Sequence, residues 1–497
     1  MDFSDSHGIK GVHMRDYCLI YLNGLRKEVR GPETLLMLGD WLRKEAGLTG
    51  TKIVCAEGDC GACTVLRAFP KFKESPLVFE AMNSCIATVA QMDGSHLVTV
   101  EGIQRGNELS PVQKAMRECH GSQCGFCTPG FIMALSGAFE KHKQLSAKTA
   151  QNYLTGNLCR CTGYQPIIDA ALATQTSSSH SLSQRYLKPD FTADLISAQT
   201  KSLLITTQTH TFFAPASLSE AVAFTNENPG FRVLGAATDF GVQTNKGKPI
   251  PKALLSLHLI PDLYEIQETP GCITVGARVP LAELRRAVSS TNPEFSKFLD
   301  LFASPQIKNV ATLVGNIANA SPIGDTLPFL LISDGQVHVA SQGPKNGTIE
   351  KRLIPLTELY LGYKSLSLKP NEIITHVSFR PHLKNEIVRL YKSSQRKDLD
   401  ISTVSGAFSL VTTQDKGIIK VQEARIALGG VAATPIRVPA AELALKQQIM
   451  TPQLFQDVAQ LLANSVKPQS DLRGSQQYRK VLVKNLFKKF GDEVLRG

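Results

Sequence analysis

The sequence lacks any apolar run long enough to cross a membrane. Its longest apolar runs, such as Leu327–Ile332, fall far short of the roughly 20 residues that a transmembrane helix needs. The first residues also lack the apolar core of a secretory signal. We therefore expect a cytoplasmic protein that makes no membrane contact.

Internal repeats, low-complexity tracts and nucleic-acid-binding motifs are also missing. The net charge of +11 does not cluster with aromatic residues in a known nucleic-acid module, so we expect no nucleic-acid partner. Part of the excess lies in Arg473–Lys489, where apolar residues recur at helical spacing. This pattern predicts a terminal helix with one buried face, formed by Val483, Leu486, Phe487 and Phe490.

Cysteine is abundant. The chain has 11 cysteines, and most of them fall into two tight groups before residue 162. Disulfides are rare in a reducing compartment, so grouped cysteines in a cytoplasmic chain indicate metal ligands.

The first group consists of Cys55, Cys60, Cys63 and Cys85. The spacing C-x4-C-x2-C with a distant fourth cysteine is the pattern of plant-type [2Fe–2S] ferredoxins. Gly58 and Gly61 allow the tight turns that present three thiolates from one loop. The alternative is a structural zinc site, which usually has paired C-x2-C knuckles.

The second group consists of Cys124, Cys127, Cys159 and Cys161. Its C-x2-C and C-x-C spacings supply four thiolates for another [2Fe–2S] cluster. Taken alone, this group fits zinc as well, but two groups in tandem favour an electron-transfer chain. Of the remaining cysteines, we expect Cys18 and Cys272 to be buried in strands, and Cys119 is a weaker ligand candidate because its position is helical.

Periodicity and capping residues predict several elements. The expected strands are Tyr17–Leu22, Leu97–Val100, Val404–Thr412 and Ile418–Leu428, with a hairpin turn at Asn23-Gly24. The expected helices are Thr34–Ala46, one that starts at Pro111 after the cap Ser110, Thr128–Phe139 and Gln165–Thr174. The Ser/Thr/Gln-rich segment Thr174–Leu195 lacks periodicity and predicts a linker.

Four motifs resemble the xanthine dehydrogenase/molybdenum hydroxylase family closely. They are the segments Cys55–Val65, Asn83–Cys85, Gly121–Gly130 and Gly156–Tyr164. The resemblance implies a multidomain α+β fold: a β-grasp [2Fe–2S] ferredoxin domain, a four-helix [2Fe–2S] domain, an FAD-binding α+β domain of the PCMH or vanillyl-alcohol-oxidase type, and an α+β domain like the C-terminal domain of CO dehydrogenase flavoproteins. The predicted bounds are a tail at 1–15, these domains at 16–103, 104–173, 209–384 and 385–497, and a linker at 174–208.

The flavin site is suggested by two stretches of small residues, Val233–Gly241 and Ala311–Asp325. Small residues allow the backbone to approach a diphosphate closely. No G-x-G-x-x-G motif opens a helix, so a Rossmann site is not supported. The resemblance implies FAD contacts from Val233, Leu234, Gly235, Ala236, Ala237, Thr238, Asp239, Phe240, Phe302, Thr312, Gly315, Asn316, Asn319, Ser321, Asp325, Ile374 and Lys392. Ala236 and Val314 stand where the family usually has glycine, and a side chain at either place could alter the backbone approach to FAD.

The resemblance also implies a function. The chain would pass electrons from a partner large subunit that holds molybdopterin, through two [2Fe–2S] clusters, to FAD and then NAD+, during oxidation of hypoxanthine or xanthine to urate. The helical-domain cluster would lie nearer the molybdenum, and Gln123 would approach the molybdopterin or make a local hydrogen bond. A heterotetramer is expected, and no catalytic residue of the substrate reaction is expected on this chain.

Two loops would border the flavin. Tyr363-Lys364 matches a loop over the flavin, and Arg396–Asp400 matches a charged loop that bears on NAD+ access, with Leu399 in place of a polar residue. The alternatives are the same role in an aldehyde or N-heterocycle hydroxylase, and a stand-alone iron–sulfur flavoprotein.

Overall fold

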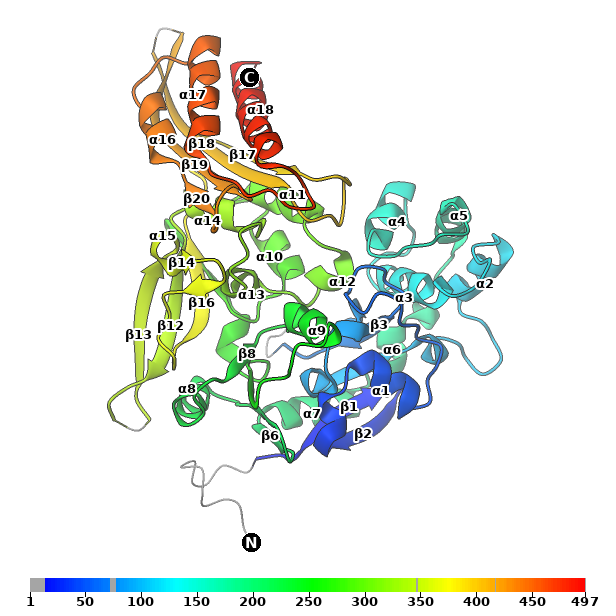
Figure 1. Cartoon of the computed structure of the whole chain (residues 1–497). Coiled ribbons are helices and arrows are strands. Elements are labelled where there is room, and N and C mark those ends of the chain that lie inside the picture. Colours follow the sequence, from blue (N-terminus) through cyan, green and yellow to red (C-terminus); the bar gives the residue numbers. More distant parts are fainter. Residues whose placement is uncertain (1–13, 72–76, 346, 416, 497) are drawn as a thin grey trace. The chain divides into compact units, whose positions relative to one another are not determined.

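The computed structural model describes residues 14–71, 77–345, 347–415 and 417–496 (Figure 1). The chain forms two compact units. The first unit comprises Met1–Tyr264, Ser304–Thr312 and Ser341–Ile349, and the second comprises Glu265–Ala303, Leu313–Ala340 and Glu350–Gly497. The boundary after Tyr264 falls inside the predicted FAD-binding domain, so this domain contributes to both units.

The first unit begins with a five-stranded sheet in the order β2-β1-β5-β3-β4. Its strands are β1 (Tyr17–Leu22), β2 (Leu25–Arg30), β3 (Thr64–Ala68), β4 (Glu80–Asn83) and β5 (Ser95–Val98). The β1–β2 turn places both Asn23 and Gly24 at positive φ, as a tight hairpin requires, and confirms the prediction. Helix α1 (Leu38–Lys44) buries Leu38 and Trp41 in the core of this unit.

Two expected elements are shorter or shifted. The predicted helix Thr34–Ala46 is α-helical only over α1, because Met37 has extended backbone (φ −63°, ψ 135°) that separates α1 from a 3-10 turn at Gly31–Leu35. The strand expected at Leu97–Val100 begins earlier, at Ser95.

Four helices follow, and they confirm the predicted helical domain. They are α2 (Pro111–Glu118), α3 (Thr128–Phe139), α4 (Ala147–Leu154) and α5 (Gln165–Ala173). The Ser110 hydroxyl accepts a hydrogen bond from the Gln113 amide, which caps α2. Helix α3 is apolar on all sides and therefore lies at the centre of this cluster, where Phe131 and Leu135 are fully buried.

The segment that the sequence predicts as a linker, from Thr174 onward, is partly helical. The segment contains α6 (Leu182–Tyr186) and α7 (Pro189–Gln199), and Tyr186 and Leu195 are buried. The Glu140 carboxylate accepts hydrogen bonds from the amides of Leu182 and Ser183. Helices α6 and α7 are short and depend on contacts with residues far away in the sequence. They therefore leave little periodic signal of their own.

The predicted N-terminal tail falls mostly on residues 1–13, which lie outside the described residues. Arg15 does not behave as part of a tail. It is 6% exposed, and its guanidinium donates two hydrogen bonds of 2.7 Å to the carboxylate of Asp93.

A second sheet of the first unit has the order β6-β7-β9-β8, in which β7, β9 and β8 are parallel. Its elements, with the helices that accompany them, are β6 (Leu203–Thr206), β7 (Thr211–Ala214), β8 (Arg232–Leu234), β9 (Ala253–Ser256), α8 (Leu218–Glu227) and α9 (Thr238–Asn245). The short helix α12 (Pro305–Lys308) also belongs to this unit.

The second unit contains a sheet in the order β10-β11-β16-β12-β13. Its strands are β10 (Ile266–Thr269), β11 (Cys272–Gly276), β12 (Gln336–Gln342), β13 (Ile349–Pro355) and β16 (Ile373–Phe379). The remaining elements before the C-terminal sheet are α10 (Leu281–Ala287), α11 (Pro293–Leu301), α13 (Leu313–Ala318), α14 (Leu327–Ile332), α15 (Leu356–Leu359), β14 (Tyr360–Gly362) and β15 (Ser365–Leu366). The rings of Phe295 and Phe329 stack at 3.8 Å, which packs α11 against α14.

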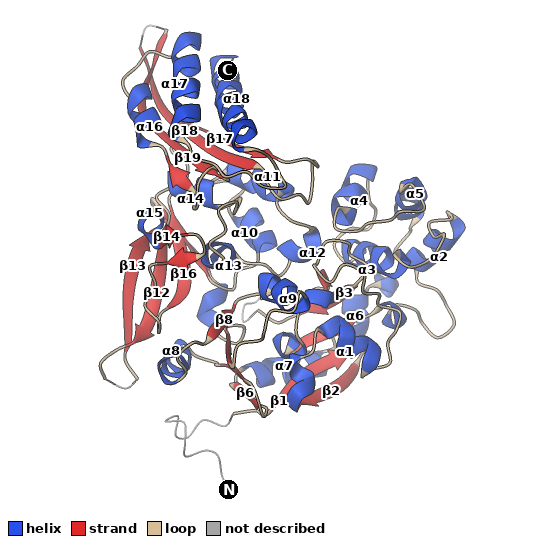
Figure 2. Ribbon diagram, viewed as in Figure 1, coloured by secondary structure: helices blue, strands red, loops and turns tan. Residues whose placement is uncertain are grey.

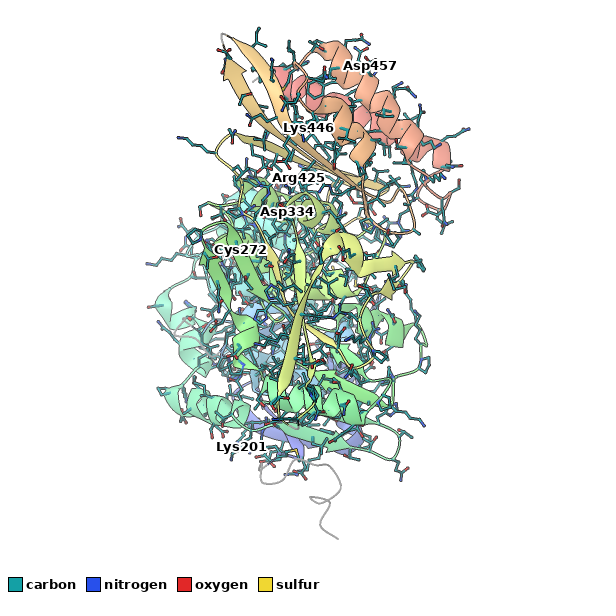
Figure 3. All side chains as sticks on the ribbon, turned by 90° about the vertical axis from the view of Figure 1, so that its left-hand side faces the viewer. Lys201, Cys272, Asp334, Arg425, Lys446 and Asp457 are labelled. Atoms are coloured by element: carbon teal, nitrogen blue, oxygen red, sulfur yellow. The ribbon has the colours of Figure 1, made fainter. Side chains whose placement is uncertain are left out.

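Cys18 is fully buried in β1, as expected, but Cys272 is not. Cys272 begins β11 and is only half-buried, because strands of this sheet alternate between a buried face and a partly exposed one (Figure 3).

The C-terminal part is a four-stranded sheet in the order β17-β18-β19-β20 with helices α16–α18 beside it (Figure 2). Its elements are β17 (Glu386–Ser393), β18 (Val404–Asp415), β19 (Ile418–Gly429), β20 (Ile436–Arg437), α16 (Pro439–Leu445), α17 (Pro452–Ser465) and α18 (Gln476–Arg496). Val483, Phe487 and Phe490 of α18 are fully buried, which confirms the predicted helix and its buried face. In the described part of the chain, no helix combines the length and apolarity needed to cross a bilayer.

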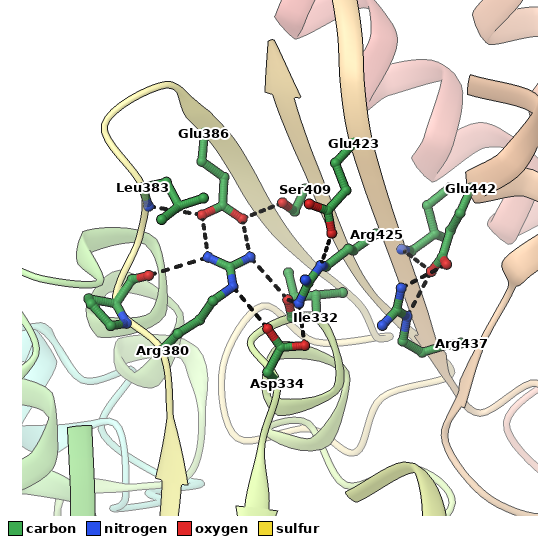
Figure 4. A network of polar contacts seen from close by, with 12 residues as sticks. Ile332, Asp334, Arg380, Leu383, Glu386, Ser409, Glu423, Arg425, Arg437 and Glu442 are labelled. Atoms are coloured by element: carbon green, nitrogen blue, oxygen red, sulfur yellow. Dashed lines mark hydrogen bonds and ion pairs between the residues drawn. The ribbon is translucent and has the colours of Figure 1, made fainter. Parts of the chain in front are cut away.

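An ionic network ties the start of the C-terminal sheet to α14 and β16 (Figure 4). Arg380, just after β16, donates two hydrogen bonds of 2.6 and 2.7 Å to the Glu386 carboxylate. Arg425 pairs with Asp334, and Arg380 also approaches Asp334 at 3.4 Å. These pairs join strands that are far apart in the sequence.

Candidate iron–sulfur and flavin sites

The first cysteine group gathers in the first unit, from the loop between α1 and β3 and from the segment after β4. Cys63 and Cys85 are almost fully buried, and both pack against Ile86 in one small apolar cluster. Asn83 donates its Nδ2 hydrogen bond to Cys63 Sγ over 3.6 Å. The backbone amides of Glu57 and Cys60 point at Cys55 Sγ at 3.4 and 3.5 Å.

The pKa values of these four thiols are shifted by one another. Hydrogen bonds from the thiols of Cys60 and Cys85 hold the pKa of Cys55 far below its usual range. The Cys85 thiol lowers the pKa of Cys63 to about 7, and the pKa values of Cys60 and Cys85 rise in return. Such mutual shifts require close sulfurs, and thiols that share protons are ready to release them to metal.

Helix α9 and the segment around α12 support this loop from the flavin-binding region. Asn245 donates hydrogen bonds to the carbonyls of Ala56 (2.8 Å) and Cys85 (2.7 Å), and so fastens the two segments that carry the ligands. Gly241 lies so close to Ile86 that a Cβ would come within 2.1 Å of the Ile86 carbonyl oxygen. Helix α9 therefore links the first cysteine group to the turn that lies just before the helix.

The second cysteine group also gathers in the first unit, but it is more exposed. Its sulfurs form two pairs: Cys124 and Cys161 are exposed with a Sγ–Sγ distance of 3.6 Å, and Cys127 interacts with the buried Cys159. Burial raises the pKa of Cys127 to about 12. Burial alone would also raise the pKa of Cys159, but hydrogen bonds from Thr162, including its hydroxyl at 3.1 Å, lower it.

Both groups fit a binuclear cluster. Within the described residues, no three histidine, cysteine, aspartate or glutamate side chains are arranged as a site for a single metal ion. In the second group the thiols form two pairs, and in the first group Cys55 interacts with Cys60 and Cys85, and Cys63 with Cys85. Each iron of a [2Fe–2S] cluster takes two cysteines, so four gathered thiols are enough for one cluster. Backbone amides that point at sulfur add the hydrogen bonds that tune such clusters.

The loops of the two groups touch each other. The Leu158 amide donates a 3.0 Å hydrogen bond to the Cys60 carbonyl, and Asn157 Nδ2 donates one of 3.1 Å to the Gly61 carbonyl. Gly130 at the start of α3 is also tight against this loop, because a Cβ there would come within 2.2 Å of the Gly61 oxygen. Residues next to ligands of one group therefore contact residues next to ligands of the other.

The predicted flavin residues divide between the units. In the first unit, Val233 and Leu234 end β8, Gly235–Ala237 form a turn, and Thr238, Asp239 and Phe240 open α9. Ala237 has left-handed backbone (φ 54°), so the chain turns sharply into the N-terminus of α9, a backbone arrangement that attracts phosphate. Thr312 approaches this turn, since its Oγ1 lies 3.7 Å from a Cβ placed on Gly235.

In the second unit, the structure brings several predicted residues together. Lys392 Nζ lies 2.7 Å from Asp325 Oδ2, and both side chains are buried. The Ser402 hydroxyl donates a 2.5 Å hydrogen bond to Asp325. The Asn316 side chain accepts a 2.7 Å hydrogen bond from Thr326, the neighbour of Asp325.

The remaining predicted FAD residues of the second unit lie on several different elements. Phe302 follows α11 and is half-buried, Gly315 is exposed on α13, and Ile374 is buried in β16. The Ser321 hydroxyl accepts a hydrogen bond from the Ile323 amide, and Asn319 receives the Lys364 ammonium at 2.5 Å. The FAD roles of all these residues remain predictions.

The two departures from the family pattern differ in consequence. Val314 is 5% exposed and packs into the core of its unit, so its side chain points away from solvent. Ala236 lies in the turn before α9 and is partly exposed. The two positions therefore differ in exposure, and Ala236 is the more accessible of the two.

The two loops expected near the flavin are ordered by local contacts. Tyr363 is 68% exposed, and Lys364 has a positive φ of 56°. In the second loop, the Arg396 amide donates to Asp400 over 2.8 Å, and Leu399 also adopts a positive φ of 55°. A leucine rarely adopts this backbone conformation, so the loop is held in a strained shape.

Residues that the sequence analysis missed are mostly buried amides and hydroxyls. They are Asn83, Asn157, Asn245, Gln306, Thr326 and Ser402. Each acts through a partner far away in the sequence or lies outside the cysteine spacing, so only the fold reveals it.

Three family models match the chain. One describes the FAD binding domain in molybdopterin dehydrogenase and covers residues 207–382. A [2Fe-2S] binding domain covers residues 99–172, and a CO dehydrogenase flavoprotein C-terminal domain covers residues 389–494. The chain therefore carries a [2Fe–2S] binding domain, an FAD-binding domain of the molybdopterin dehydrogenase type and a C-terminal domain of the CO dehydrogenase flavoprotein type. The α+β multidomain prediction and the expectation of [2Fe–2S] and FAD-binding domains are thereby confirmed.

The curated relatives that this chain resembles are longer proteins. Xanthine dehydrogenase 1 of Arabidopsis thaliana is 30% identical over 95% of this chain, and the match covers 39% of that protein. Xanthine dehydrogenase of Drosophila pseudoobscura pseudoobscura is 28% identical over 96% of this chain and is also covered to 39%. The chain thus spans about two fifths of the length of these relatives.

Two solved structures share the fold of a little more than half of this chain. A chain of carbon monoxide dehydrogenase from Hydrogenophaga pseudoflava matches with a TM-score of 0.51 and 24% identity, over 56% of this chain and 94% of that chain. A chain of quinoline 2-oxidoreductase from Pseudomonas putida 86 matches with a TM-score of 0.51 and 23% identity, over 56% and 93%.

Proposed function

We propose that this chain is the electron-transfer subunit of a xanthine-dehydrogenase-type enzyme. It would receive electrons from a molybdopterin centre on a partner large subunit, pass them through two [2Fe–2S] clusters to FAD, and deliver them to NAD+. The substrate reaction, oxidation of hypoxanthine or xanthine to urate, would take place on the partner, and a heterotetramer is the expected assembly.

The observation that carries this proposal is the contact between the two cysteine loops. The amide of Leu158, next to Cys159, donates to the carbonyl of Cys60 over 3.0 Å. Two metal centres whose protein ligands are joined by one hydrogen bond form a short route for electrons. Two isolated structural metal sites would have no need for such a contact.

The exposure of the cysteines supports an order in which electrons reach the second cysteine group before the first. Cys124 and Cys161 of the second group are exposed, so this centre is available to a partner protein. Cys63 and Cys85 of the first group are buried, and Asn245 of α9 holds their loop from the flavin side. Iron–sulfur clusters carry single electrons, and a flavin exchanges single electrons on one side and pairs on the other.

In this assignment the residues of the chain bind and orient cofactors. The eight grouped cysteines would hold iron, and the amides around Cys55 and Cys63 would tune the first cluster. The α9 N-terminus would bind the FAD diphosphate, and Asp325 would lie on the adenosine and diphosphate side. No residue of this chain is assigned to the chemistry of the purine.

The xanthine dehydrogenase relatives favour a purine substrate and NAD+, since they align over almost the whole chain. A second candidate is the same electron-transfer role beside a hydroxylase of another N-heterocycle or an aldehyde, which the fold likeness to quinoline 2-oxidoreductase favours.

Co-purification from the native cell, followed by assays of the complex, tests the proposal. We expect a molybdenum-containing partner and NAD+ reduction with hypoxanthine or xanthine. Activity with quinoline or an aldehyde but not with purines would support the second candidate. A chain that purifies alone and reduces acceptors without any molybdenum partner would contradict both.

A further inference from the structure

A chain of buried amides links the two cysteine loops. Asn157 is 2% exposed and donates through Nδ2 to the Gly61 carbonyl, which lies between two ligands of the first group. Gln306 is fully buried and donates through Nε2 to Asn157 Oδ1 over 2.7 Å. The Thr64 hydroxyl donates to the same Gly61 carbonyl over 2.6 Å and approaches Gln306 Nε2 at 3.4 Å.

The glycines at this junction have no space for a side chain. A Cβ on Gly156 would come within 2.1 Å of Gln306 Oε1, and a Cβ on Gly61 would come within 2.2 Å of the Gly156 carbonyl oxygen. Gly61 also has a positive φ of 67°, which other residues rarely adopt. The backbones of the two loops are therefore in direct contact, and the Gln306 side chain packs against Gly156.

Gln306 comes from a different part of the chain. It lies in α12, in the segment Ser304–Thr312 that is inserted into the first unit. Its neighbour Ile307 packs against the apolar cluster of Cys63, Cys85 and Ile86. The segment thus contacts the first cysteine group through Ile307 and the loop of the second group through Gln306.

We propose that Gln306 and Asn157 are positioning residues that fix the separation and relative orientation of the two iron–sulfur clusters. This inference rests on the proposed function, since it requires both clusters. Neither side chain bonds to a ligand sulfur. Asn157 bonds to the backbone next to a ligand, and Gln306 bonds to the side chains of Asn157 and Thr64. Together they hold in place the Leu158–Cys60 hydrogen bond between the loops.

The test uses the holoprotein of the full chain with both clusters reduced, in electron paramagnetic resonance at low temperature. Two nearby reduced clusters split or broaden each other's signals, and this magnetic interaction depends steeply on their separation and orientation. We expect the wild-type chain to show it. We expect Gln306→Met, which keeps the length but cannot donate, to lose or visibly change the splitting while iron content and the position of each signal stay the same.

The chain offers a matched control. Gln199 is 1% exposed and donates a hydrogen bond from Nε2 to the Gly94 carbonyl over 3.2 Å, away from both cysteine loops. Gln199→Met should therefore leave the splitting unchanged. A second test variant, Gln306→Glu, keeps the shape of the side chain but replaces the Nε2 donor with a carboxyl oxygen at a buried site. Unchanged iron content and circular dichroism in both variants would exclude a general loss of folding.

Because Gln306 and Asn157 act in one hydrogen-bonded chain, their effects should not add. Asn157→Leu should change the splitting in the same way as Gln306→Met, and the double variant should change it no further. An unchanged splitting in both Gln306 variants, or an equal change in Gln199→Met, would overturn the inference and leave the proposed function intact. A wild-type chain without two cluster signals would overturn both.

Discussion

The first unit, which holds both cysteine groups, buries thiols and amides beside its many hydroxyls, whereas the second unit buries carboxylates that are paired with arginine or lysine. Cys63, Cys85 and Gln306 illustrate the first kind. The pair Asp325–Lys392, with side chains 6% and 4% exposed, and the fully enclosed carboxylate of Glu386 illustrate the second. The Arg15–Asp93 pair is an exception in the first unit.

The difference teaches how each unit should respond to its surroundings. Thiols grouped around a metal site contribute their full stability only when metal is bound, so the first unit should depend on iron. Buried ion pairs depend on the protonation of their carboxylates, so the second unit should depend on pH. The single tryptophan, Trp41, lies in the first unit and reports its unfolding separately by fluorescence.

The largest expected effect is the loss of one whole cluster. Cys85→Ser removes a buried ligand of the first group, and iron should fall from about four to about two per chain. The Trp41 fluorescence transition in urea should move to lower denaturant, because the metal no longer stabilises this unit. Iron analysis and paramagnetic resonance measure the outcome.

Cys124→Ser is the paired control, because it removes an exposed ligand of the second group. It should remove the other cluster signal and leave the first one in place. If either substitution removed both signals, the assignment of four cysteines to each cluster would be wrong.

The next effect concerns the buried pair of the second unit. Asp325→Ala leaves the Lys392 ammonium without its partner at 2.7 Å. Breaking one side of a buried ion pair costs about 3–5 kcal/mol of unfolding free energy. Urea unfolding followed by circular dichroism measures this, and Trp41 fluorescence should not report it.

Asp325→Asn is a milder variant that keeps a hydrogen-bond acceptor for Lys392 and Ser402. It should recover part of the loss. A cost below ~1 kcal/mol for Asp325→Ala would mean that the pair is hydrated and does not stabilise the second unit in the way described.

The pH dependence of the second unit should show the contribution of Glu386. Burial alone would raise the pKa of Glu386, but hydrogen bonds from Arg380 and Ser409 outweigh it and lower the pKa from 4.5 to about 2. The folded pKa lies below the unfolded one, so the stabilisation is complete above about pH 4.5 and is lost as the pH falls to about 2. The loss is on the order of 3 kcal/mol.

Glu386→Gln cannot titrate and should flatten this part of the pH profile, while it lowers stability at neutral pH. Unfolding free energies measured by circular dichroism from neutral pH downward test the difference. Profiles of the same slope for both proteins would exclude Glu386 as the group responsible.

The smallest expected effect is a shift in the reduction potential of the second cluster alone. The Thr162 hydroxyl donates a 3.1 Å hydrogen bond to Cys159 Sγ, and such bonds favour the more negative, reduced cluster. One hydrogen bond of about 0.5–1.5 kcal/mol corresponds to roughly 20–60 mV for a single electron. Thr162→Val should lower the reduction potential of the second cluster by this amount.

Thr162→Ser keeps the hydroxyl and should leave the potential close to that of the wild type. Redox titration followed by paramagnetic resonance resolves the two centres. A shift of the first cluster instead of the second would show that the signals have been assigned to the wrong groups.

Local signals in the sequence were sufficient for much of the fold. The Ser110-Pro111 cap, the Asn23-Gly24 turn and the spacing of apolar residues in the last helix each depend on neighbours along the chain, and all three are present. Helices α6 and α7 were missed because their stability comes from distant contacts such as those of Glu140.

The candidate sites follow the same rule. Cysteine spacing is local, so both groups could be predicted, and the structure brings the thiols of each group together. The supports of the cysteine loops, Asn245 and Gln306, could not be predicted, because each comes from a segment more than 100 residues away in the sequence. The burial of Val314 could not be predicted either, because it depends on how the chain folds around this residue.

The most direct test of the central claim is paramagnetic resonance of the reduced holoprotein, together with its iron and flavin content. We predict about four iron atoms and one flavin per chain, with two distinct iron–sulfur signals that disappear one at a time in Cys85→Ser and Cys124→Ser. A colourless protein that contains zinc, or a single iron–sulfur signal, would contradict the account.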